Sequence, residues 1–96
     1  MKLVWRKAAT RDLNDIWNFS EANWGRSRAD RYMTALRDTA VALAEGKLSG
    51  VAANDIQPSL RRQVSGSHVI WFRVEADLLR VVRVLHQSRD AGKWVG

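Results

Sequence analysis

The chain has 96 residues with no cysteine and a single proline, a size that suits one domain and excludes a disulfide scaffold, a thiolate metal site and a cysteine nucleophile. Hydrophobic residues make up 46% and charged residues 27%, which is a globular composition, and no apolar run approaches the about 20 residues that a membrane span needs. The 16 basic and 10 acidic residues leave a net charge of +6, which favours an anionic partner such as nucleic acid, a nucleoprotein or an acidic protein.

The first half of the chain has the pattern of a short strand followed by two amphipathic helices. Residues 2–6 are β-prone and predict the strand. From Thr10, apolar residues recur at spacings of three and four until Gly25, whose position is typical of the residue that ends a helix. A second helical pattern starts at Arg26 or Ser27. The short link predicts an antiparallel helical hairpin.

After a predicted loop at residues 49–59, the spacing of apolar residues changes to the period of strands. Strands are predicted at residues 60–64, 68–74 and 78–86, and the last two are rich in β-branched and aromatic side chains. The last strand is apolar on both faces, so its second face needs a cover from the tail or from a partner. Alternation places Leu79, Val81 and Leu85 on one face, and Leu78, Val82 and Val84 on the other.

The order β-α-α-β-β-β predicts an α+β fold in one domain over residues 1–96, because the strands are segregated from the helices. The helical hairpin is expected to cover one face of a mostly antiparallel four-stranded sheet. Residues 87–96 form a polar C-terminal tail with one large apolar side chain, Trp94. We expect Trp94 either to dock back over the sheet or to anchor a partner.

Groups suited to acid–base chemistry are few. The sequence has no phosphate loop, no HExxH pattern and no clustered metal ligands, so we expect no cofactor and no metal. His68 and His86 are interpreted as structural residues at strand ends, because a lone histidine needs a partner to catalyse. Tyr32 lies on the apolar stripe of the second helix, and Arg11-Asp12 has the pattern of solvated helix surface.

Arg83 is the most informative arginine. It lies between apolar residues in a strand predicted to be central, so its charge must be paired or face a partner. Glu75 and Asp77 are the candidate acidic partners within the chain. For Arg73, which shares a face with Val69 and Trp71, solvent is the favoured surrounding.

Two stretches carry residues that are typical of one protein family. They are Ala9, Asp12-Leu13, Ile16-Trp17, Trp24-Gly25, Ala29 and Tyr32 near the start, and Val81 to Asp90 at the end. From Leu3 to about Asp90 the chain resembles the RelE/ParE superfamily of bacterial toxins, and its ParE branch in particular. The resemblance implies the β-α-α-β-β-β toxin fold and one of two activities. ParE toxins act on DNA gyrase, whereas RelE toxins cleave mRNA on the ribosome.

Missing residues favour the ParE branch. RelE-type nucleases usually carry a tyrosine or a second histidine beyond the last strand, where this chain has Gln87, Ser88 and Arg89. A lysine-rich middle segment is also typical of them, and here only Lys47 lies between Lys7 and Lys93. We therefore expect a type II toxin with a role in plasmid stabilisation that inhibits gyrase by binding, and that is more a binding protein than an enzyme.

One alternative is a degenerate family member that binds the antitoxin but has lost toxicity. The other is a RelE-like, ribosome-dependent mRNA endonuclease. Its catalytic set, with arginines on the phosphate and a histidine as acid or base, is Arg61, Arg62, Arg83 and His86.

The resemblance also implies a cognate, ParD-like antitoxin, small and with an acidic, amphipathic C-terminal segment. Such a segment lays a helix or strand on the sheet face and along the helices, and the +6 charge suits it. We expect a toxin–antitoxin hetero-oligomer in the cytoplasm, without membrane contact. The residues expected to contact the antitoxin or the target are Arg83, Arg73, Arg61 and Trp94.

Overall fold

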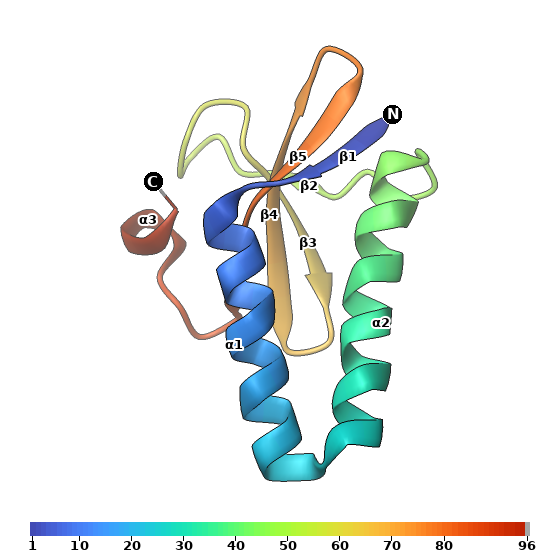
Figure 1. The fold of residues 1–96 in the computed structure, drawn as a ribbon. Helices are drawn as coiled ribbons and strands as arrows, with labels where there is room; N and C mark the ends of the chain where they lie inside the picture. The colour runs from blue at the N-terminus through green and yellow to red at the C-terminus, as the bar shows by residue number, and fades with distance from the viewer. Residues whose placement is uncertain (96) are drawn as a thin grey trace.

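Two long helices lie against one face of a five-stranded sheet in the computed structural model, which describes residues 1–95 (Figure 1). The elements in chain order are β1 (Lys2–Trp5), α1 (Lys7–Trp24), α2 (Arg26–Ala44), β2 (Val51–Ala52), β3 (Arg61–Ser65), β4 (His68–Glu75), β5 (Leu78–His86) and α3 (Ala91–Trp94). The sheet order is β1-β5-β4-β3-β2. β1 runs parallel to β5, and the other neighbours are antiparallel.

The predicted α+β class and the helical hairpin are confirmed, but the strand count of four is wrong. A fifth strand, Val51–Ala52, lies inside the predicted loop and pairs with Arg61 and Arg62 of β3. Two residues are too short to show the alternation by which a strand is recognised. α1 begins at Lys7, earlier than the predicted Thr10. Within the described residues, no helix is both long and apolar enough to cross a membrane.

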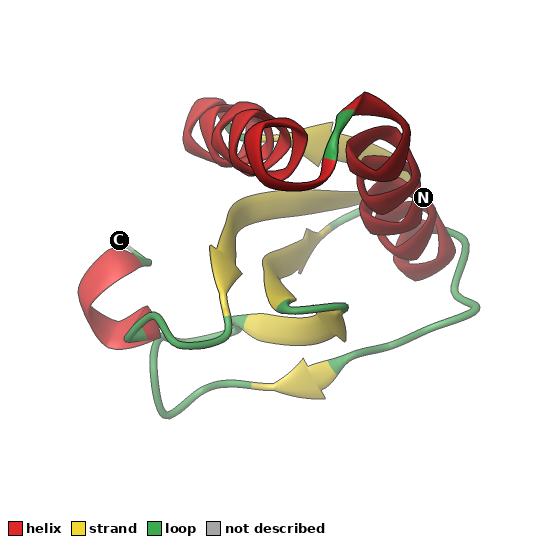
Figure 2. Cartoon of the chain, turned by 90° about the horizontal axis from the view of Figure 1, so that it is seen from below, coloured by secondary structure: helices red, strands yellow, loops and turns green. Residues whose placement is uncertain are grey.

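The C-terminal segment supplies the cover that the second face of the sheet needs. Figure 2 shows both long helices together on one side of the sheet, with α3 away from them. α3 is a single turn capped by the Asp90 side chain, which accepts from the Gly92 amide at 3.0 Å. Ala91 and Val95 are 6% and 2% exposed. They pack with Ala53, Leu60, Trp71, Val82 and Leu85 in a core cluster separate from the one beneath the helices.

A β-bulge in β5 changes which residues face the helices. Arg83 lies opposite Trp71 and Val81 lies opposite Phe72, so Val82 is an extra residue without a counterpart in β4. Beyond the bulge, Val84 faces the helices together with Leu79 and Val81, and Leu85 joins the second cluster. The predicted alternation was therefore wrong for Val84 and Leu85, because strict alternation does not allow for an inserted residue.

A glycine at the start of β2 is required by both its backbone and its neighbours. Gly50 has a φ of +67°, and a Cβ atom there would lie 2.6 Å from the Arg62 carbonyl oxygen. We expect Gly50→Ala to lower the free energy of unfolding by about 2–4 kcal/mol, from the left-handed backbone and the clash together. Gly46→Ala is the matched control, because Gly46 has a φ of +78° but open space around it. Its expected loss is about 1 kcal/mol, and equal losses in urea unfolding would contradict the steric argument.

Candidate functional site

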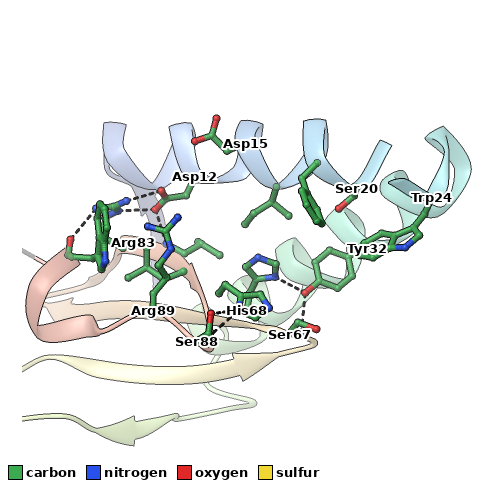
Figure 3. Close-up of a pocket in the computed structure, with 16 residues that line it drawn as sticks. Asp12, Asp15, Ser20, Trp24, Tyr32, Ser67, His68, Arg83, Ser88 and Arg89 are labelled. Carbon is green, nitrogen blue, oxygen red and sulfur yellow. Dashed lines mark hydrogen bonds and ion pairs between the residues drawn. The ribbon is translucent and has the colours of Figure 1, made fainter. Parts of the chain in front are cut away.

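A groove of about 820 Å³ lies between α1, α2 and the C-terminal end of β5 (Figure 3). One part of its lining is apolar and aromatic, and the other holds histidines, serines and arginines. The lining residues are Asp12, Asp15, Ile16, Phe19, Ser20, Trp24, Tyr32, Ser67, His68, Arg83, Val84, Leu85, His86, Ser88, Arg89 and Trp94.

Three aromatic side chains of the groove remain open to solvent. Phe19, Trp24 and Trp94 are 62%, 49% and 40% exposed. Phe19 and Trp24 pack edge to face with ring centroids 5.9 Å apart, and the Arg28 guanidinium lies 5.3 Å from the Trp24 ring. Large apolar side chains gathered on one concave surface are typical of a binding site for another protein.

An ion pair between α1 and β5 stabilises one end of the groove. The Asp12 carboxylate accepts from Arg83 Nε at 2.7 Å and from Arg83 Nη2 at 2.8 Å. It also accepts from the Val84 backbone amide at 2.9 Å. The pairing of β5 with β1 ends at Val81, so the Val84 amide lies on an edge of the sheet with no neighbouring strand. Asp12 supplies the acceptor that this amide would otherwise lack.

Arg83 links β5 to α1 and α3, and its charge is already neutralised by Asp12 within the fold. Besides Asp12, its guanidinium donates to the Trp94 carbonyl oxygen of α3 at 2.9 Å. The hydrogen bond to the Asp12 carboxylate raises the pKa of Arg83. Arg83 is thus paired, but not with Asp77 or with Glu75, which pairs with Arg80 at 3.2 Å.

The interpretation of Asp12 as solvated helix surface was wrong, because the residue is only 9% exposed. The sequence did contain a signal for this burial. Asp12 lies three residues after Ala9 and four before Ile16, and both of these are buried on the apolar stripe of α1. A carboxylate on that stripe needs a cationic partner inside the fold, and Arg83 was the arginine set among apolar residues.

Tyr32, His68 and His86 form a row along the polar part of the groove, joined by one hydrogen bond and one ring contact. The Ser67 amide donates to the Tyr32 hydroxyl oxygen at 3.0 Å, so the hydroxyl proton is free to donate to His68 Nδ1 at 2.6 Å. The His68 and His86 rings meet edge to face, 5.5 Å apart, because these residues pair directly in the β4–β5 register. Single-residue patterns could not show this pairing, which depends on strand register.

The Nδ1 atom of each imidazole takes part in a hydrogen bond. His86 Nδ1 accepts from the Ser88 amide at 3.1 Å, as His68 Nδ1 accepts from Tyr32. Burial, and then the nearby His86, lower the pKa of His68 to about 4, while the Asp12 carboxylate opposes this shift. His68 is therefore neutral at pH 7.

The lowered pKa of His68 predicts a loss of stability in acid. An unfolded histidine titrates near pH 6.5 and the folded one near 4, so the unfolded chain binds more protons between these values. The free energy of unfolding that depends on a neutral His68 is therefore fully present above about pH 6.5. It is lost as the pH falls towards 4. Urea unfolding should show this loss, about 2 kcal/mol after allowance for solvent screening. His68→Gln keeps an acceptor for Tyr32 without titrating, and parallel profiles of the two proteins would refute the prediction.

The other predicted site residues lie away from the groove. Arg61 donates to the carbonyl oxygens of Ser49 and Gly50 at 3.0 and 3.3 Å. Arg73 bonds the Gln57 side chain, which in turn donates to the Val95 carbonyl oxygen at 2.6 Å. Both arginines hold segments of their own chain. Of the predicted contact residues, Arg83 and Trp94 line the groove.

Of the four residues named for a nuclease, Arg83 and His86 line the groove, but Arg61 and Arg62 do not. Arg61 and Arg62 lie opposite Phe72 and Trp71, whereas His86 lies at the other end of β4, opposite His68. His68 itself pairs with Ser65, three residues beyond Arg62 and so about 10 Å further along the strand. In residues 1–95, no group of three or more His, Cys, Asp or Glu side chains is placed to hold a metal ion.

Comparison with known proteins gives consistent matches over nearly the whole chain. Residues 3–91 match the family model described as ParE toxin of type II toxin-antitoxin system, parDE. The chain is 38% identical over 90 residues to Toxin ParE1 of Caulobacter vibrioides, a match that covers 94% of this chain and 93% of that protein. It is 33% identical over 87 residues to Toxin ParE1 of Mycobacterium tuberculosis, a match that covers 90% of this chain and 89% of that protein.

A solved structure described as the chromosomal ParDE TA system from P. aeruginosa has the same fold. Its TM-score is 0.78 at 19% identity, and the match covers 90% of this chain and 95% of that chain.

Proposed function

Because the chain belongs to the ParE toxin family of type II toxin–antitoxin systems, we propose that its groove receives the cognate antitoxin and that the free toxin inhibits DNA gyrase. The resemblance stated from the sequence is confirmed by the family match. The observation that supports the groove as the docking site is the set of three exposed aromatic side chains along it, Phe19, Trp24 and Trp94.

The proposed antitoxin segment is an acidic, amphipathic helix or strand. A helix of this kind anchors apolar side chains at spacings of three and four in a groove, as the apolar lining here requires. The net charge of +6 would accelerate its association with an acidic partner. We further propose that toxin and antitoxin form a hetero-oligomer in the cytoplasm.

Co-expression tests the antitoxin half of the proposal. Induction of the toxin alone should arrest growth, and co-expression of a small acidic protein encoded by an adjacent reading frame, as expected for the antitoxin, should restore growth. The two proteins should then purify together through a tag on either one. Growth arrest that the neighbouring protein leaves unchanged, with both proteins present at equal levels, would count against this partner.

The gyrase half is a proposal of inhibition by binding rather than by chemistry. It is supported by the hydrogen bonds that the polar side chains of the groove make with each other, which leave fewer of them for catalysis. Tyr32 bonds His68, and His86 bonds Ser88. Of the arginines named for phosphate binding, Arg83 lines the groove with His86, but Asp12 neutralises it.

A single substitution separates this proposal from mRNA cleavage. His86→Ala removes the acid or base that a nuclease would need. His86 is exposed, and the substitution loses its bonds to Ser88 and its ring contact with His68. We expect toxicity to be retained at equal protein levels in a plating assay. If the variant is folded by circular dichroism and yet harmless, the nuclease assignment replaces the gyrase proposal.

A further inference from the structure

We infer that the Arg89 guanidinium, stacked on Trp94 at the groove, is a carboxylate-binding residue that selects the cognate antitoxin. This inference rests on the proposed function and deepens it, because it names the chemical group that the antitoxin must present. The groove alone accepts apolar side chains, which discriminate poorly between related amphipathic segments.

Arg89 is held in place by its surroundings. Its guanidinium carbon lies 4.5 Å from the centroid of the Trp94 ring, a cation–π geometry. Its backbone amide donates to the His86 carbonyl oxygen at 2.9 Å, which fixes the turn after β5. Asp90 accepts from the Trp94 amide at 3.2 Å through its backbone carbonyl, so the turn and α3 hold the guanidinium and the indole together.

The Arg89 guanidinium lies over the Trp94 ring, and no side-chain hydrogen bond in the described part of the chain uses its N–H donors. These donors form a planar fork that suits a carboxylate. Within residues 1–95, the ion pairs present are Lys47–Glu45, Arg80–Glu75 and Arg83–Asp12. Among the lining residues, Arg83 is neutralised inside the fold, so Arg89 is the lining arginine that remains for a partner. Arg28 lies over Trp24 but does not line the groove.

The acidic groups near Arg89 do not take up this charge. The Asp90 side chain accepts from the Gly92 amide, and Asp12 accepts from Arg83 and the Val84 amide. Asp15 also lines the groove, three residues after Asp12 on α1 and thus on a neighbouring part of the helix surface (Figure 3). The position of Asp15 disfavours a second carboxylate beside α1, so an acidic segment would enter with its carboxylate at Arg89 and its apolar side chains at Phe19 and Trp24.

The occupant proposed is therefore the acidic segment of the antitoxin, with one Asp or Glu side chain on Arg89. Binding is measured by isothermal titration of the full-length antitoxin into the full toxin chain. Charge-assisted hydrogen bonds of this kind correspond to about 10- to 150-fold in affinity. We expect Arg89→Glu to weaken binding by at least about 30-fold and Arg89→Gln by about 10-fold.

Arg37→Glu is the matched control, because Arg37 is an exposed arginine of α2 that does not line the groove. It makes the same change in net charge, and we expect less than about a threefold effect from a screened surface charge. An antitoxin in which the contacting acidic residue is replaced by arginine should recover affinity for the Arg89→Glu toxin and lose it for the wild type.

Different failures have different meanings. If the wild-type toxin binds the antitoxin and Arg89→Glu behaves as Arg37→Glu does, the inference about Arg89 is wrong and the proposed function stands. If the wild-type toxin does not bind the antitoxin, the proposed function fails, and the inference fails with it. If Arg89→Glu abolishes binding of a single-stranded RNA oligonucleotide but leaves antitoxin affinity intact, the cation serves nucleic acid and the inference is overturned.

Discussion

Replacing Asp12 by alanine is expected to lower the free energy of unfolding by about 3 kcal/mol, a large loss for one side chain in a domain of this size. The reason is that three donors lose their acceptor at once. Arg83 keeps only the Trp94 carbonyl oxygen, and the Val84 amide on the open edge of β5 is left unpaired. The Asp12 and Arg83 side chains are 11% and 21% exposed, so water cannot fully replace what is lost.

Urea unfolding followed by circular dichroism measures this loss. Two further variants serve as controls for it. Asp15→Ala removes an exposed carboxylate of the same helix and should cost less than about 0.5 kcal/mol. Asp12→Asn keeps an acceptor for the Val84 amide but removes the charge, so its loss should lie between those of the two alanine variants. An Asp12→Ala protein as stable as Asp15→Ala would refute the structural role of the ion pair.

Phe19→Asp is expected to weaken antitoxin binding by at least about 100-fold, because aromatic anchors dominate the affinity of such grooves. Phe19 is 62% exposed in the free toxin, so the substitution should leave the fold intact. An aspartate at this position would place a charge against the apolar side chains of the partner and would remove the packing against Trp24. In cells, the variant should remain toxic in the presence of the antitoxin.

The control for Phe19→Asp is Val41→Asp. Val41 is an apolar residue of α2 with 42% exposure that does not line the groove. Titration of the antitoxin into both variants, with circular dichroism to verify folding, measures the difference. Equal affinities for the two variants would mean that the antitoxin binds another surface of the toxin.

Most of the fold is predictable from the sequence because the long elements carry strong periodic patterns. The helical hairpin and the strands from residue 60 onward follow from the spacing of apolar residues. The short elements β2 and α3 do not, because two residues or a single turn cannot display a period. The bulge at Val82 is equally invisible, since it depends on how β5 pairs with β4.

The site was less predictable than the fold, because long-range contacts build it. Asp12 and Arg83 are 71 residues apart in the chain, and Tyr32 and His68 are 36 apart. The sequence identified Arg83 and Trp94, and the structure places both in the groove. It gave no sign that Arg89 stacks on Trp94, since that contact depends on the turn after β5 and on the short helix that follows.

The proposed action of the free toxin on DNA gyrase can be tested with purified components. Gyrase, ATP and relaxed circular DNA are incubated with the full toxin chain, and supercoiling and cleaved DNA are followed on agarose gels. We expect loss of supercoiling and accumulation of cleaved DNA, both reversed by the antitoxin. Unchanged supercoiling with folded toxin, together with mRNA cleavage on translating ribosomes, would contradict the proposed action on gyrase.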